Sequence, residues 1–179
     1  MMKKFSSVAL ISISVFTLIS CREKTISIPI HATSPEIIFT IPATPIAGTV
    51  ATPEVSVPNI LDSVIAASGI PMDNIQSVVL NSADMVIDTP ATANFDPFDA
   101  LSIWFRTTAT DSVQVFNVTN IPHTQLTSLT SQGNGTDFFS LVKSPQLMVR
   151  SRVTTSSPIP QTMTIKMKIH FTVTAQKTI

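Results

Sequence analysis

Cysteine, glycine and charged side chains are scarce in this 179-residue chain, and tyrosine is absent. The first three scarcities each exclude a class of site or of partner. The single cysteine permits no disulfide within the chain and no zinc site built from several thiolates. The four glycines form no loop of the kind that cradles a phosphate, so the sequence predicts no nucleotide cofactor. We expect the protein to work without any cofactor.

The low charge of the chain also limits its partners. Charged residues make up 12% of the sequence, against a typical value of about 25%, and the formal net charge is +0. Proteins that bind nucleic acid need clustered Lys and Arg to neutralise phosphates. No such stripe is present, so we predict no nucleic-acid partner.

The first residues of the chain carry an export signal. Lys3 and Lys4 precede an apolar run from Val8 to Ile19, which is shorter than the roughly 20 residues that span a bilayer. The tetrapeptide "LISC", from Leu18 to Cys21, overlaps the end of this run and resembles the lipobox of bacterial lipoproteins. The resemblance covers residues 1–21 only.

This resemblance implies that residues 1–20 are a signal peptide removed before Cys21 and that Cys21 is acylated. Residues 21–24 are then a lipidated tether, and several acyl chains would hold the protein stably on a membrane. Arg22 stands where an aspartate would indicate retention in the inner membrane, so we expect attachment to the outer membrane of a bacterial cell envelope. The domain could face the periplasm or the outside.

Period-two alternation of apolar and polar residues is the main fold signal. It is strictest in residues 162–175, "TMTIKMKIHFTVTA", and it predicts a strand with one buried and one solvated face. Further strands are predicted at 25–31, 36–41, 74–90, 99–107, 111–119 and 145–153, and residues 120–136 are predicted to be loop. Asn59 and Gly69 bracket one short helix near residues 59–68.

We therefore predict an all-β fold for residues 25–179. The pattern indicates a single antiparallel β-sandwich of the Ig-like or jelly-roll type, with that one helix.

Residues able to carry out catalysis or hold a metal are dispersed along the chain. His31, His123 and His170 have no neighbours that indicate a base, and we interpret them as exposed or hydrogen-bonded, so we predict no enzyme and no catalytic residue. One group of oxygen ligands could converge on Ca²⁺, although turn-capping is the simpler interpretation and we predict no metal. Its members are Asp84, Asp88, Asn94, Asp96 and Asp99.

The candidate binding residues are one aromatic and four cations. Trp104 alternates with apolar residues and would serve as a sugar-stacking platform or pack beneath a loop. Arg150 and Arg152 share one strand face, as do Lys166 and Lys168. If these two strands pair, the four cations form a basic strip for anionic lipid head groups or an acidic glycan; otherwise they keep a sheet face soluble.

The predicted function follows mainly from the leader. We expect a lipid-anchored, exported lipoprotein of the cell envelope that acts as a non-enzymatic binding or structural module. The alternatives are a glycan- or lipid-binding surface protein and, less favoured, a fimbrial or complex subunit or a hydrolase.

Overall fold

The computed structural model describes residues 25–58, 69–107, 111–144 and 146–178. The leader, acylation site and tether predicted for residues 1–24, and the helix predicted near residues 59–68, all lie outside the described residues.

Strands dominate the described part of the chain. They are β1 (Thr25–Thr33), β2 (Ile37–Ile41), β3 (Gly48–Ala51), β4 (Val55–Pro58), β5 (Ile75–Thr89), β6 (Phe98–Arg106), β7 (Ser112–Thr119), β8 (Ser128–Gln132), β9 (Gln146–Thr155) and β10 (Met163–Thr178). A 3-10 turn, η1 (Met72–Asn74), and a short helix, α2 (Phe139–Val142), complete the described elements. The all-β prediction is confirmed.

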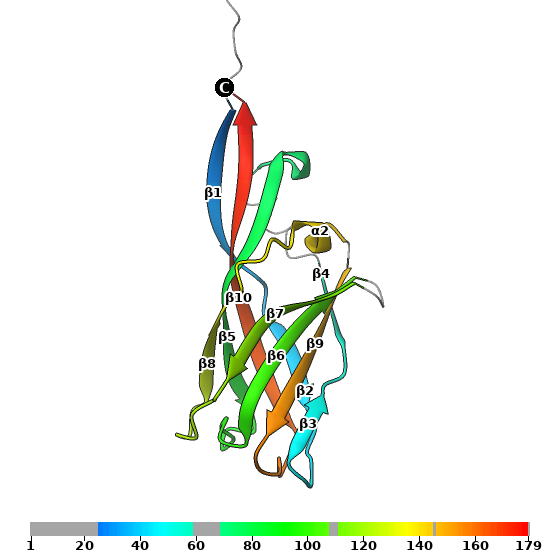
Figure 1. The fold of residues 1–179 in the computed structure, drawn as a ribbon, viewed down its shortest axis with the longest axis vertical. Helices are drawn as coiled ribbons and strands as arrows, with labels where there is room; N and C mark the ends of the chain where they lie inside the picture. Colours follow the sequence, from blue (N-terminus) through cyan, green and yellow to red (C-terminus); the bar gives the residue numbers. More distant parts are fainter. Residues whose placement is uncertain (1–24, 59–68, 108–110, 145, 179) are drawn as a thin grey trace, which may run out of the picture.

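The strands form two antiparallel sheets that pack face to face (Figure 1). Sheet I has the order β1-β10-β5-β8, and β2 pairs with the first part of β10 on the same side as β1. Sheet II has the order β3-β9-β6-β7, and β4 likewise shares β9 with β3. Thus β1 with β2, and β3 with β4, each act as one interrupted edge strand.

This pairing identifies the sandwich as a jelly roll. Counting each interrupted edge as one strand gives eight positions, and the first pairs with the last, the second with the seventh, the third with the sixth and the fourth with the fifth. Such an order is a long hairpin folded over itself into two four-stranded layers, as in a double Greek key. Of the two sandwich types predicted, the described strands follow the jelly roll.

The most regular stretch of the sequence lies in the middle of the molecule. Strand β10 pairs with β1, β2 and β5, and its apolar face is buried as predicted, at Met163, Ile165, Met167, Ile169, Phe171, Val173 and Ala175. Burial of each of these side chains except that of Ala175 contributes about 1.5–3 kcal/mol to the stability of the fold. Three shifts of register against β5 bend this long ladder, and Figure 1 shows β1, β10 and β5 running on beyond sheet II.

Both interrupted edges use the same device. Ser34 follows β1 and Thr52 follows β3, and each is followed by Pro and Glu. The Ser34 hydroxyl accepts a hydrogen bond from the Ile169 N–H at 3.0 Å, and the Thr52 hydroxyl accepts one from the Ser151 N–H at 3.1 Å. A buried hydroxyl thus continues the ladder where proline cannot donate, and the interruption discourages pairing with another chain.

Three strands and the helix α2 were missed by the pattern. Strand β8 falls within residues 120–136, which were predicted as loop, because its inward residues are Leu129 and the buried Ser131 rather than two apolar side chains. Strands β3 and β4 contain four residues each, too few to show a period. Among the described residues, no helix has the length and apolar character needed to cross a membrane.

Candidate functional site

The four cations that would form one basic strip if their strands paired lie on different sheets. Arg150 and Arg152 are on β9 of sheet II, whereas Lys166 and Lys168 are on β10 of sheet I. Strand β9 pairs with β3, β4 and β6 and does not pair with β10. The strip therefore does not form, because the folded hairpin places the last two strands in opposite layers.

Trp104 is instead brought together with the two arginines. Trp104 lies directly opposite Arg150 in the β6–β9 ladder, and Ser102 lies opposite Arg152. As the alternation predicts, Leu101, Ile103 and Phe105 are buried while Trp104 is half-buried on the outer face. The Trp104 indole N–H donates to the Ser102 hydroxyl at 3.3 Å, which orients the ring.

These residues line a shallow hollow that carries positive charge. It has a volume of about 160 Å³ and is lined by Trp104, Ser112, Arg150 and Arg152. Both arginines are exposed, and neither forms an ion pair with any described residue. The third arginine of this region, Arg106, is neutralised by Glu54. The hollow thus combines an aromatic ring with two uncompensated guanidinium groups.

On sheet I, Lys166 is compensated by acids. The Lys166 Nζ lies 2.7 Å from Asp88 and 3.9 Å from Glu36. Hydrogen bonding to Asp88, followed by its charge, raises the pKa of Lys166 above its ordinary value. Lys168 lies opposite Asp84, whose carboxylate bonds to other side chains.

A row of hydrogen-bonded side chains crosses four of the five strands of sheet I, namely β1, β10, β5 and β8. Thr33 on β1 bonds to His170 Nδ1 at 3.0 Å, and His170 Nε2 bonds to Asp84 at 2.8 Å. Asp84 also accepts a hydrogen bond from Thr130 on β8 at 2.8 Å. The bonds from Thr130 and His170 lower the pKa of Asp84 below its ordinary value.

The Thr33, His170 and Asp84 groups have the composition of a hydrolase relay, but they lie on an open strand face. Hydrolases place such groups beside a pocket and an oxyanion site. The hollows lined by Trp104, by Phe138, by Pro97 and by Gln132 include none of these three side chains. His31 forms a shorter row with Thr172 at 3.1 Å, so both rows are cross-strand contacts of a polar sheet face.

The candidate Ca²⁺ ligands are spread over two regions. Asp84 and Asp88 lie on the outer face of β5 and bond to His170 and Lys166. In the loop after β5, the Asn94 side chain accepts from the Asp96 N–H, and Asp96 accepts from the Gln125 N–H. Asp99 lies at the start of β6, with its carboxylate 3.4 Å from His123 Nε2. Within the described ranges, no group of three or more His, Cys, Asp or Glu is placed to hold a metal ion. The residues serve as turn caps and cross-strand partners.

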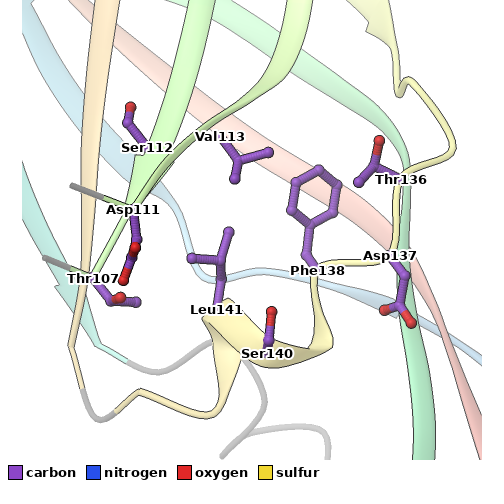
Figure 2. A pocket seen from close by; sticks show the side chains of 9 residues that line it. All are labelled: Thr107, Asp111, Ser112, Val113, Thr136, Asp137, Phe138, Ser140 and Leu141. Carbon is purple, nitrogen blue, oxygen red and sulfur yellow. The ribbon is translucent and has the colours of Figure 1, made fainter.

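A second hollow adjoins the arginine site and was not anticipated from the sequence. It has a volume of about 470 Å³ and lies between the β6–β7 end and the segment that leads into α2. Figure 2 shows apolar side chains in its middle, surrounded by hydroxyl and carboxylate groups. The lining residues are Thr107, Asp111, Ser112, Val113, Thr136, Asp137, Phe138, Ser140 and Leu141.

The 133–138 segment is fixed against β5, and this fixes one wall of the second hollow. The Gly133 N–H donates to the Asn81 carbonyl at 2.7 Å, and the Phe138 N–H donates to the Val78 carbonyl at 2.8 Å. Asp137 accepts from the Val78 N–H at 2.9 Å. Serine and threonine occur throughout the chain, so the sequence gave no signal for this hollow, and only the convergence of its lining side chains in space marks it.

Comparison with known proteins returns distant structural neighbours. No protein-family model and no curated protein sequence matches it. Three of the solved structures that resemble it are the following. A decameric BFDV capsid protein has a TM-score of 0.39 and 12% identity, over 85% of this chain and 99% of that one. Desmodium yellow mottle tymovirus has a TM-score of 0.30 and 13% identity, over 100% and 95%, and infectious bursal disease virus, Gt strain, has a TM-score of 0.35 and 12% identity, over 82% and 33%.

These neighbours contradict the function predicted from the sequence. That prediction was a lipid-anchored lipoprotein of the cell envelope acting as a non-enzymatic binding or structural module, whereas the three structures named above are a capsid protein and two viruses. We therefore correct it and do not carry it forward. At identities of 12–13% and TM-scores below 0.5 we also transfer no capsid function to this chain.

Proposed function

We propose that the protein binds an anionic ligand that carries a ring, through Trp104, Arg150 and Arg152 on the outer face of sheet II. The observation that carries the proposal is the pair of exposed guanidinium groups, without an acidic partner among the described residues, beside a half-buried indole. The proposal concerns this site alone and does not depend on a membrane anchor.

The two residue types supply complementary parts of recognition. A guanidinium group binds a carboxylate, sulfate or phosphate through two parallel hydrogen bonds, and each charged bond contributes about 1.5–3 kcal/mol. The face of an indole packs against the apolar face of a ring, and its own N–H is already bonded to Ser102. Because the net charge of the chain is +0, attraction of an anion to this face is local.

The test uses the fluorescence of Trp104, which is the single tryptophan of the chain and therefore reports on this site alone. Titration with tetragalacturonate is expected to shift the emission and to yield a dissociation constant below about 1 mM, which corresponds to only about 4 kcal/mol. Maltotetraose, which has no charge, is expected to bind at least tenfold more weakly.

Two variants of the site and one matched control separate binding at this site from the effect of general charge. Arg150→Gln and Arg152→Gln should each weaken binding of tetragalacturonate by about 10- to 100-fold, as expected for one charged hydrogen-bonding group. Lys168→Gln on sheet I removes the same charge and should leave the affinity unchanged. Equal losses in all three variants, or no binding of the acidic probe, would refute the proposal.

A further inference from the structure

Arg150 and Arg152 bring two positive charges to one small hollow. They are two residues apart on the exposed face of β9, which places their backbones about 6.6 Å apart. Both line the hollow of about 160 Å³ that also contains Trp104. That volume lies below the roughly 300–1,000 Å³ of most ligand pockets. The hollow therefore accommodates one charged group together with one face of a ring, rather than several units of a chain.

Within the described part of the chain, no acid compensates this double charge. Glu54, which lies between β3 and β4, is paired with Arg106, and neither Arg150 nor Arg152 has an acidic partner there. Two like charges held this close repel each other, so a ligand that neutralises both gains more than one that neutralises a single guanidinium group. The site thus favours an anionic group with a charge of about −2, opposite to that of the two arginines.

The number of acceptor oxygens favours the same kind of group. A guanidinium group presents parallel N–H donors, and one such group occupies both oxygens of a carboxylate in the paired geometry. A phosphate monoester has three terminal oxygens and a charge of about −1.5 to −2 at pH 7. It therefore accepts from two guanidinium groups at once, whereas a carboxylate leaves one of them without a full partner.

Trp104 lies beside both arginines, where the ring that carries such a group would pack. In the β6–β9 ladder Trp104 is directly opposite Arg150. Its indole N–H donates to Ser102, which is opposite Arg152, so the indole extends along β6 from one arginine towards the other. A ring attached to an anion between the two arginines is thus within reach of the indole.

We infer that the ligand of this site is a sugar phosphate, whose phosphate monoester is held jointly by Arg150 and Arg152. Its ring packs its apolar face against Trp104, and Ser112, which also lines the hollow, bonds to a sugar hydroxyl. This inference rests on the proposed function, because it uses the same site, and it adds which anion the site selects. Neither arginine alone makes that selection, since one guanidinium group binds a carboxylate or a phosphate.

The test compares three compounds that share one ring and differ only in the group at its sixth carbon. Glucose 6-phosphate has three terminal oxygens and a double charge at about pH 8, glucose 6-sulfate has three oxygens and a single charge, and glucuronate has two oxygens and a single charge. Trp104 fluorescence and calorimetry should show glucose 6-phosphate binding roughly tenfold or more tighter than glucuronate, as expected for one additional charged hydrogen bond, with the sulfate ester between them. Inorganic phosphate, which has no ring, should bind more weakly than glucose 6-phosphate by a similar factor.

Removal of one arginine tests joint recognition directly. Arg150→Gln and Arg152→Gln each leave a single guanidinium group, so the ratio of the affinities for glucose 6-phosphate and glucuronate should fall towards one. A variant that only disturbs the fold would weaken both compounds equally and keep the ratio. Lys168→Gln, on sheet I, removes the same charge and should leave the ratio unchanged.

The outcomes separate this inference from the proposed function. Equal affinity for glucose 6-phosphate and glucuronate, or a ratio that Arg150→Gln and Arg152→Gln leave unchanged, overturns joint recognition of a phosphate, while binding of tetragalacturonate keeps the arginine site. Equal binding of the sulfate and phosphate esters overturns selection of a double charge. Equal binding of inorganic phosphate and glucose 6-phosphate overturns the sugar. If no acidic compound binds, tetragalacturonate included, both proposals fall.

Discussion

Gly133 offers the sharpest test of the packing that supports the second hollow. A Cβ atom built there would lie 1.9 Å from the Leu80 carbonyl oxygen and 2.6 Å from its carbon, and these atoms belong to the backbone of β5. Reaching an allowed separation requires a movement of more than 1 Å, which also stretches the 2.7 Å bond from the Gly133 N–H to Asn81. Overpacking costs about 1–3 kcal/mol and the lost bond about 0.5–1.5 kcal/mol, so Gly133→Ala should lower the free energy of unfolding by roughly 2–4 kcal/mol.

Urea unfolding followed by circular dichroism measures this loss, and a fall of about 4–16 °C in Tm should accompany it. Gly135→Ala is the control, because Gly135 has a φ of 73° but open space around its Cβ position. That variant should cost only about 1 kcal/mol, from the left-handed backbone. Ordinary surface substitutions change the free energy of unfolding by about ±0.5 kcal/mol. If Gly133→Ala changes it by no more than that, the close approach of Gly133 to β5 is refuted.

The remaining predictions concern the interrupted edge and the polar face of sheet I. Thr52→Val keeps the shape of a buried side chain but leaves the Ser151 N–H without its acceptor; we expect a loss of about 1–3 kcal/mol in urea unfolding. The exposed Thr49→Val should change stability by less than about 0.5 kcal/mol, and similar losses in both would contradict this role. Hydrogen bonds to Thr130 and then to His170 hold the pKa of Asp84 below its ordinary value of 3.8, so the stabilising effect of its carboxylate is present above about pH 4 and is lost as the pH falls through the folded pKa. Asp84→Asn should therefore reduce the loss of stability between about pH 5 and pH 2, and an unchanged slope of stability against pH would count against it.

Much of the architecture could be predicted from alternation alone. The buried face of β10 and the outward position of Trp104 both follow from period two, because successive side chains of a strand point to opposite faces. The same rule places Arg150 and Arg152 on one face of β9. Strand β8 was missed, since Ser131 faces inward where the rule requires an apolar residue.

The candidate site was less accessible to sequence reasoning. Its cations were predicted to form one strip only if their two strands pair, and the folded hairpin places these strands in different sheets. The larger hollow joins residues near 107–113 with residues near 136–141, and no local pattern links these segments.

Local alternation and hydrophobicity were thus enough to predict which faces of the regular strands are buried. The contacts of Trp104 with Arg150 and Arg152, and of Lys166 with Asp88, could be found only in the folded molecule. Strand neighbours are set by long-range pairing within each sheet. That pairing is a property of the whole chain and is not written in any one strand.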